Sequence, residues 1–398
     1  MPETKKNIVP APEIVSVEVT EYKPALRQLC WTILVLLMLL PFFMSINTGL
    51  QTVLYSCTCV FLGCLYAIEF DKPGQRVNQF EEKMNWTDTL SFPLYASCAL
   101  VTLYFLYSIL PKILLNTLFR INFCVLGFTL MFPFILTKVP GLFPAVPNKS
   151  FGRFTKTIAG TLIDLELDTH SFISAGISGL LIVIYFFTGH WSLNNIMAIS
   201  FTVGGIKLMR VPNFRYSVVL LWLLFFYDIY WVFKTDVMIT VAKSFDAPIK
   251  LSFPLNTEFK KFSLLGLGDM VIPGICMAVI LKFELDMKIK ARMNNKKESS
   301  TLTMAEVNSW KTPMFHITMG FYLLSIVATL AGMHLMKHAQ PALLYIVPAI
   351  TIAFATCAFV FKCHKEMYEY EDDDVGVEPE GLKECKNTEI KDKSENKE

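Results

Sequence analysis

Long apolar stretches, separated by short connections rich in charged side chains, dominate this chain. A helix needs about 20 mainly apolar residues to cross a bilayer, within a range of about 17 to 25. Hydrophobic residues make up 53% of the 398 residues and charged residues 18%, and their segregation along the chain predicts a membrane protein. Ten stretches approach the required length: 29–46, 52–68, 91–110, 121–137, 172–189, 193–209, 217–233, 263–281, 314–336 and 340–361.

The apolar stretches favour helices over strands. In lipid the backbone must satisfy its own hydrogen bonds, which leaves helix bundles and closed barrels as the spanning folds. Barrel strands would alternate apolar and polar residues, and these stretches do not. The sequence therefore predicts an all-α, polytopic membrane helix bundle. Nine stretches are good spans, whereas 52–68 is ambiguous because it follows the first stretch closely and carries polar side chains. It either crosses the membrane or lies in an interfacial or re-entrant position.

Lysine and arginine counts in the connections predict the orientation, because the cytosolic loops of membrane proteins carry the excess of basic residues. If every stretch from residue 91 onward crosses, one face receives 17 basic residues and the other receives 8. The basic face, which is predicted to be cytosolic and to carry the tail beyond Phe361, receives the connections 69–90, 138–171, 207–216 and 282–313. The N-terminus is cytosolic only if both early stretches cross.

The chain divides into three parts. Residues 1–28 form a polar N-terminal segment, 29–361 form the membrane domain, and 362–398 are predicted to be a disordered cytosolic tail, acidic at 369–374. The net charge of +2 gives no nucleic-acid signature. Eight of the ten cysteines lie inside or at the edges of apolar runs, and no Cys or His spacing suggests a ligand set, so no metal or other cofactor is expected.

Two acids stand inside late apolar stretches. Asp228 lies in 217–233, directly after Tyr227, and Asp269 lies in the next stretch, 263–281. A charged side chain at the bilayer centre costs about 2.5 to 3.5 kcal/mol, so such residues usually have a function. Consecutive spans tend to pack as neighbours, and two carboxylates that share one proton carry a single charge. This is the working state of an aspartic protease, in which one carboxylate activates water and the other polarises the peptide carbonyl.

Glycines and a proline surround the second acid. In a helix over 263–281, Gly266 would lie one turn before Asp269 on the same face, and Gly268 would adjoin it. Pro273 has no N–H, so the Asp269 carbonyl would lose its helical donor. The expectation is a loosened helix that admits water and an extended peptide.

A third element opens the last apolar stretch, 340–361. Pro341 interrupts the helical hydrogen bonding there, and Ala342 and Leu343 add small, apolar surface. By physical reasoning alone this is an interrupted start of a helix.

At these residues the sequence resembles the signal peptide peptidase and presenilin family of intramembrane aspartyl proteases. The matching motifs are Tyr227-Asp228, Gly266-Leu267-Gly268-Asp269 and Pro341-Ala342-Leu343, in that order and each on its own late span. Within the family the likeness is strongest to the signal peptide peptidase branch. It extends to YDIYWVF at 227–233, TVAKSFDAPIKL at 240–251, LGLGDMVIPG at 265–274 and KHAQPALLYIVP at 337–348, and also to FPLYASC at 92–98 and HW…NN at 190–195.

The resemblance implies a presenilin-like protease of nine spans in the endoplasmic reticulum membrane, with a lumenal N-terminus and a cytosolic C-terminus. Asp228 and Asp269 would be the catalytic pair. The residues that would support the site and position substrate are Tyr227, Gly266, Gly268, Pro341, Ala342 and Leu343. Its substrates would be signal-peptide remnants and type II oriented transmembrane segments. The resemblance leaves open a homo-oligomer and partners from quality control in that compartment. The stretch 52–68 is extra to the nine-span plan.

Two other functions use intramembrane acids. A proton-coupled transporter or channel would bind and release protons at both aspartates, but it would be expected to show inverted repeats, which the sequence lacks. A non-proteolytic membrane chaperone would bind the same substrates without cutting them. Tight binding of a transition-state analogue would separate a protease from both.

Overall fold

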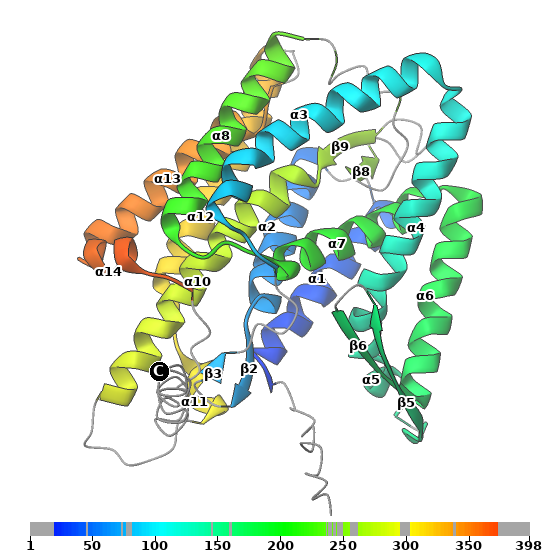
Figure 1. Cartoon of the computed structure of the whole chain (residues 1–398), viewed down its shortest axis with the longest axis horizontal. Coiled ribbons are helices and arrows are strands. Elements are labelled where there is room, and N and C mark those ends of the chain that lie inside the picture. The colour runs from blue at the N-terminus through cyan, green and yellow to red at the C-terminus, as the bar shows by residue number, and fades with distance from the viewer. Residues whose placement is uncertain are drawn as a thin grey trace, which may run out of the picture.

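The computed structural model describes residues 20–44, 47–72, 75–76, 82–144, 146–158, 161–235, 250–254, 262–294, 303–336 and 340–372, together with the single residues 237, 241 and 244. Within these ranges the chain is a bundle of long helices with short strand pairs (Figure 1). The predicted helical membrane fold is therefore confirmed. Most of the motif at 240–251, and residues 337–339 of the motif at 337–348, lie outside the described residues.

Among the described residues, eight helices are long and apolar enough to cross a membrane. They are α1 (Pro24–Phe43), α2 (Thr48–Tyr66), α3 (Trp86–Ile109), α4 (Lys112–Leu136), α6 (Thr169–Thr188), α8 (Phe214–Phe233), α12 (Pro313–Met336) and α13 (Leu343–Val360). Two further long helices, α7 (Trp191–Leu208) and α10 (Gly268–Asn294), contain more polar residues. The shorter helices are α5 (Val139–Leu142), α11 (Met304–Ser309) and α14 (His364–Glu369).

Helices α2, α7 and α10 form the centre of the bundle, where they pack against one another. The side chain of Ile206 on α7 fits between Gly63 of α2 and Gly274 of α10. A methyl group added at either glycine would lie 2.5 or 2.4 Å from this isoleucine. Glycine at both positions therefore permits the close approach of three helices. Around this centre α4 and α6 lie on one side, and α8, α12 and α13 on the other (Figure 1).

The ambiguous stretch 52–68 forms most of α2. This helix contacts α1, α7, α10 and α12, and twelve of its residues are buried. Its thiol at Cys64 donates a hydrogen bond to the Gly274 carbonyl of α10 at 3.4 Å. Of the polar side chains that made the stretch ambiguous, Ser56, Cys59 and Cys64 are fully buried against other helices, which is why composition alone did not identify the span.

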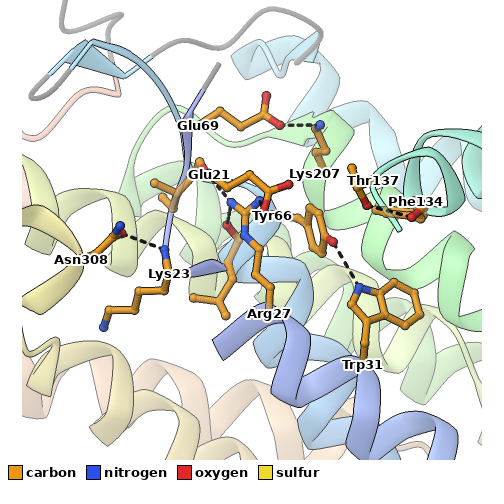
Figure 2. Close-up of polar contacts among 12 residues, drawn as sticks. Glu21, Lys23, Arg27, Trp31, Tyr66, Glu69, Phe134, Thr137, Lys207 and Asn308 are labelled. Atoms are coloured by element: carbon orange, nitrogen blue, oxygen red, sulfur yellow. Dashed lines mark hydrogen bonds and ion pairs between the residues drawn. The ribbon is translucent and has the colours of Figure 1, made fainter. Parts of the chain in front are cut away.

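A buried arginine anchors the α1–α2 pair, as Figure 2 shows. Arg27, 2% exposed, donates to the carbonyls of Leu65 and Ile68 at 2.8 and 2.9 Å. Its guanidinium also lies 4.5 Å from the centre of the Tyr66 ring. Terminal helix carbonyls lack partners within the helix, so the arginine caps the end of α2 and joins it to α1. Beyond this cap, Glu69 pairs with Lys207 of α7 at 2.6 Å (Figure 2).

Three of the four basic connections, 69–90, 207–216 and 282–313, lie together on one face of the bundle. Strand β1 (Thr20–Glu21) pairs with β2 (Glu69–Lys72), which also pairs with β3 (Gln75–Arg76), and β4 (Glu82–Lys83) pairs with β7 (Met209–Arg210). The backbone N–H of Lys23 donates to Asn308 of α11 at 2.8 Å. On the same face Asp372 pairs with Arg210 at 2.8 Å. The segment after α13 therefore shares this face with the connections.

The position of β1 corrects one expectation. The family resemblance implies an N-terminus opposite to the C-terminus, but Thr20 and Glu21 pair with Phe70 and Glu69 on the basic face. Helices α1 and α2 run in opposite directions, so two early crossings return the chain to the face where it began. The first described residues and the segment after α13 are therefore on one side.

The segment after residue 361 corrects a second boundary. Residues 362–372 are not a disordered tail, because α14 and the residues after it pack against the bundle and Asp372 is fully buried. Their partners lie on other helices, which acidic composition cannot indicate. Residues 373–398 lie outside the described part of the chain. At the other end, α1 begins at Pro24, inside the segment 1–28 that was expected to be polar.

Accessibility in sealed microsomes would test this topology. Asn85 and Asn148 both stand in sequons on the basic face, so neither is expected to carry a glycan if that face is cytosolic. Added protease should remove the chain beyond residue 372 and also an epitope tag fused to the N-terminus. A glycan at Asn148 would reverse the orientation, and a protected N-terminal tag would contradict the α1–α2 pair.

Candidate active site

Asp228 lies near the end of α8, five residues before the helix stops at Phe233. Its carboxylate is buried, with 6% of the residue exposed. Helix α8 occupies 214–233, close to the predicted 217–233, and packs against α3, α10 and α13. The acid predicted from the sequence therefore projects into the bundle, between the two helices that carry the other motifs.

Asp269 lies in the first turn of α10, and this corrects the expected helix over 263–281. Residues Phe262–Gly266 form strand β9, which pairs antiparallel with β8 (Lys250–Pro254), and the helix begins only at Gly268. Gly266 is therefore the last residue of a strand, not a position one helical turn before the acid. An extended chain thus leads directly to Asp269, and the helix that follows runs to Asn294 rather than ending at residue 281.

Two asparagines hold the β8–β9 pair against α7. Asn195 donates to the Ser252 carbonyl at 2.9 Å and accepts from the Ser252 N–H at 2.8 Å. Asn194 donates to the Lys250 carbonyl at 2.7 Å. These side chains belong to the HW…NN element, and sequence reasoning gave them no structural role. They satisfy backbone groups of β8 and so fix the strand pair that ends beside Asp269.

The interrupted hydrogen bonding at Asp269 is present as expected. Pro273 lies inside α10 and has no N–H to offer the Asp269 carbonyl. The hydroxyl of Tyr322 on α12 instead donates to this carbonyl, at 3.4 Å. Tyr322 is fully buried. Sequence reasoning missed it because Pro273 shows that a donor is needed, whereas only the packing of α12 shows which residue provides it.

The two glycines leave space beside the second acid. A methyl group added at Gly266 would lie 3.4 Å from Oδ2 of Asp269 and, its chain neighbours aside, would meet no other atom of the described residues within 4 Å. At Gly268 an added methyl group would meet nothing within 4 Å. The side of Asp269 that faces the strand is therefore open, although the reason is a strand end rather than a bare helix face.

The Pro341-Ala342-Leu343 motif lies next to Asp228. Helix α13 begins at Leu343, directly after Pro341 and Ala342, so the interrupted helix start is confirmed. The backbone N–H of Leu343 lies at the helix start, where it has no helical acceptor, and it is near the Asp228 carboxylate. The Pro341-Ala342-Leu343 motif therefore borders the acid on α8.

Tyr227 plays a packing role in the described structure. It is half-buried, and its ring centre lies 6.4 Å from that of Trp231 one turn later. Trp231 in turn donates to Ser97 of α3 at 3.1 Å. These contacts hold α8 to α3 next to Asp228. Within the part of the chain that the structure describes, the Tyr227 hydroxyl makes no hydrogen bond to either carboxylate.

The structure brings the three motifs together. Helix α8 packs against α10 and α13, so Asp228 and Asp269 stand on neighbouring helices. Asp228 is buried beside the start of α13, and Asp269 stands in the first turn of α10 beside open space. Two neighbouring acids of this kind can activate water and polarise a carbonyl. Within the described residues no cluster of His, Cys, Asp or Glu could hold a metal ion.

Comparisons with known proteins point to one family. The family profile described as Signal peptide peptidase matches residues 76–374, a range that contains all three motifs and leaves α1 and α2 outside. The human protein named signal peptide peptidase is 34% identical over 324 residues, which are 79% of this chain and 80% of the human one. Its mouse counterpart is 35% identical with the same coverage. A Caenorhabditis elegans protein named intramembrane protease 2 is 37% identical over 193 residues, 47% of this chain and 40% of its own.

Proposed function

The chain belongs to the signal peptide peptidase family of intramembrane proteases, and from this membership we propose that Asp228 and Asp269 form the catalytic pair of an aspartic protease. One carboxylate takes a proton from water as the water attacks a peptide carbonyl. The other, protonated, donates a hydrogen bond to that carbonyl and stabilises the tetrahedral intermediate. The observation that carries the proposal is that α8, which holds Asp228, packs against α10, which holds Asp269.

The substrates are proposed to be signal-peptide remnants and type II oriented transmembrane segments. A peptide bond inside a helix has its carbonyl hydrogen-bonded, so the substrate must open before it can be cut. Strand β9 ends at Gly266, beside Asp269, and an extended segment can pair with backbone groups of a strand edge. Open space at Gly266 and Gly268 gives water and this extended segment access to the acid.

The membrane of residence is proposed to be that of the endoplasmic reticulum, where signal peptides are released, with the basic face in the cytosol. A homo-oligomer and quality-control partners in that membrane are compatible with this role. No nucleic-acid partner is proposed, because the net charge is only +2.

A transition-state analogue that carries a hydroxyl in place of the scissile carbonyl would test the proposal. The purified protein in detergent should cleave a synthetic signal peptide and bind the analogue far more tightly than the peptide, by a factor of at least about 100. A transporter, or a chaperone that only holds substrates, would bind the analogue no better than the peptide. Failure of both cleavage and tight binding would overturn the proposal.

The Tyr322 hydroxyl is expected to support Asp269. Tyr322→Phe removes the donor to the Asp269 carbonyl and keeps the packing of the ring. A loose catalytic acid should lower kcat by about tenfold, while KM for the signal peptide changes little. Tyr345→Phe on α13 is the matched control, because it removes a hydroxyl from a half-buried tyrosine of a neighbouring helix. Equal rates for the two variants would show that the hydrogen bond has no catalytic effect.

A further inference from the structure

Residues 364–372, here called the C-terminal strap, lie across the start of α8 and the middle of α10. These are the two helices that carry Asp228 and Asp269. The strap consists of α14 followed by Tyr370, Glu371 and Asp372. Its contacts involve both helices and the residues immediately before α8.

The contacts with α8 are polar and aromatic. Arg215 donates to the Tyr368 carbonyl at 3.0 Å, and its guanidinium lies 3.9 Å from the centre of the Tyr368 ring. The Tyr370 ring centre lies 5.9 Å from that of Phe214. The backbone N–H of Asp372 donates to the Pro212 carbonyl at 2.7 Å. The strap is thus fixed to the first turn of α8.

The contacts with α10 are of the same kind. The Tyr370 hydroxyl donates to Oδ2 of Asp286 at 2.8 Å, and the ring centres of Tyr370 and Phe283 are 5.1 Å apart. Phe214 of α8 also contacts Phe283, with ring centres 5.5 Å apart. Tyr370 therefore lies against aromatic side chains of both helices.

Asp372 joins the two helices by charge. Its Oδ2 lies 2.8 Å from Nε of Arg210, just before α8, and 3.4 Å from Nζ of Lys282 on α10. The carboxylate is fully buried, and the side chains of Arg210 and Lys282 are 6% and 4% exposed. Removing the carboxylate would leave two buried positive charges without this shared partner, which is unfavourable.

The bridge can control the site from a distance. Lys282 lies 13 residues along α10 from Asp269, about 20 Å at 1.5 Å per residue, and Asp228 lies at a similar distance along α8 from Phe214. A slide or rotation of one helix against the other at the strap would move the carboxylates relative to each other. Misplacement of reacting groups by about 1 Å can cost a factor of about 100 in rate.

We propose that Asp372 is a positioning residue, which fixes α8 against α10 through Arg210 and Lys282 and so sets the spacing of Asp228 and Asp269. The inference rests on the proposed function, because this spacing matters to the rate only if the two aspartates act together. The chain after the last membrane helix thus takes part in forming the site.

Asp372→Asn tests the bridge, since it keeps the size of the side chain and removes its charge. We expect kcat for a synthetic signal peptide to fall by about tenfold, with KM and the amount of protein in the membrane unchanged. Glu369→Gln is the matched control. It removes one negative charge from the same strap, at an exposed position, and should leave kcat unchanged. The double variant Lys282→Met/Asp372→Asn removes one charge of each sign, so the net charge between the helices stays the same. It should show the same low kcat as Asp372→Asn, which would indicate that loss of the bridge, rather than misfolding, lowers the rate.

A disulfide between α8 and α10 would distinguish a positioning role of Asp372 from a general effect on stability. The thiol of Cys276 on α10 lies 3.8 Å from the Ser217 carbonyl of α8, so Ser217→Cys puts two thiols at the interface of these helices. Oxidation removes two electrons and two protons from this pair, with iodine as the oxidant and iodide as its product. Once oxidised, Ser217→Cys/Asp372→Asn should regain most of the lost kcat and lose it again on reduction with a thiol. Ser217→Cys alone should keep its kcat in both states.

The outcomes are distinct. A wild-type kcat for Asp372→Asn, or a loss that the disulfide does not restore, would overturn the positioning role. Asp228→Ala and Asp269→Ala are assayed in parallel. If these two variants are inactive while Asp372→Asn is normal, only the inference about the strap falls. If they retain activity, the proposed function falls.

Discussion

Asp228→Ala and Asp269→Ala are each expected to abolish cleavage of a signal peptide, with a loss of at least about 10⁴ in rate. The reason is that neither acid can both activate water and polarise the carbonyl. Asp228→Asn and Asp269→Asn should fail equally, because an amide cannot exchange the proton. The measurement is the rate of product formation by purified protein in detergent, detected by mass spectrometry.

The control for these variants is Asp286→Asn. Asp286 is also a buried acid of α10, 2% exposed, but it lies on the basic face and bonds to Tyr370. We expect this variant to keep far more activity than either substitution at the two proposed catalytic acids. Insertion and yield of all variants should match the wild type. Near-normal turnover by Asp228→Asn or Asp269→Asn would contradict the catalytic assignment.

Gly266→Leu is expected to give the second largest effect. The missing side chain of Gly266 faces the Asp269 carboxylate, so a leucine there would fill the space that water and the extended substrate need. We expect kcat/KM for the signal peptide to fall by about 100-fold, as for other displacements at a catalytic group. The spans should be unaffected, because, chain neighbours aside, no other atom of the described residues lies within 4 Å of the added Cβ.

The matched control is Gly320→Leu on α12. This glycine is exposed on the helix surface, and a Cβ there meets nothing within 4 Å, so the same substitution should be tolerated. Steady-state rates for both variants, with membrane yields as a check, give the comparison. Equal rates for Gly266→Leu and the wild type would show that the strand end does not border the substrate.

The sequence predicted the structure correctly where a local property, such as hydrophobicity or a proline, determines the secondary structure of one segment. Asp228 was expected in a span over 217–233, and α8 occupies 214–233, because a long apolar run in lipid has to be helical. Pro273 and Pro341 act locally on hydrogen bonding, so the orphaned carbonyl at Asp269 and the start of α13 after Pro341 were also predictable. Each of these predictions needed no knowledge of distant residues.

The sequence was misleading where an apolar segment could take either secondary structure. Residues 263–266 read as part of a helix, since short apolar runs do not distinguish a strand from a helix. They form β9 because β8 pairs with them, and β8 is itself held by Asn194 and Asn195 of α7. The pairing of two strands that are separated in the sequence therefore made Gly266 the end of a strand rather than part of a helix.

Sequence by itself determined the helical membrane class, the three motifs and the two acids, because hydrophobicity and proline chemistry act within one segment. Tertiary structure decided the rest. It turned 52–68 into a buried helix, brought both described ends of the chain to one face, chose Tyr322 as the donor to Asp269 and buried Asp372 between Arg210 and Lys282. These features depend on partners more than 50 residues away in most cases, and a side chain's charge or hydroxyl does not specify which distant group will satisfy it.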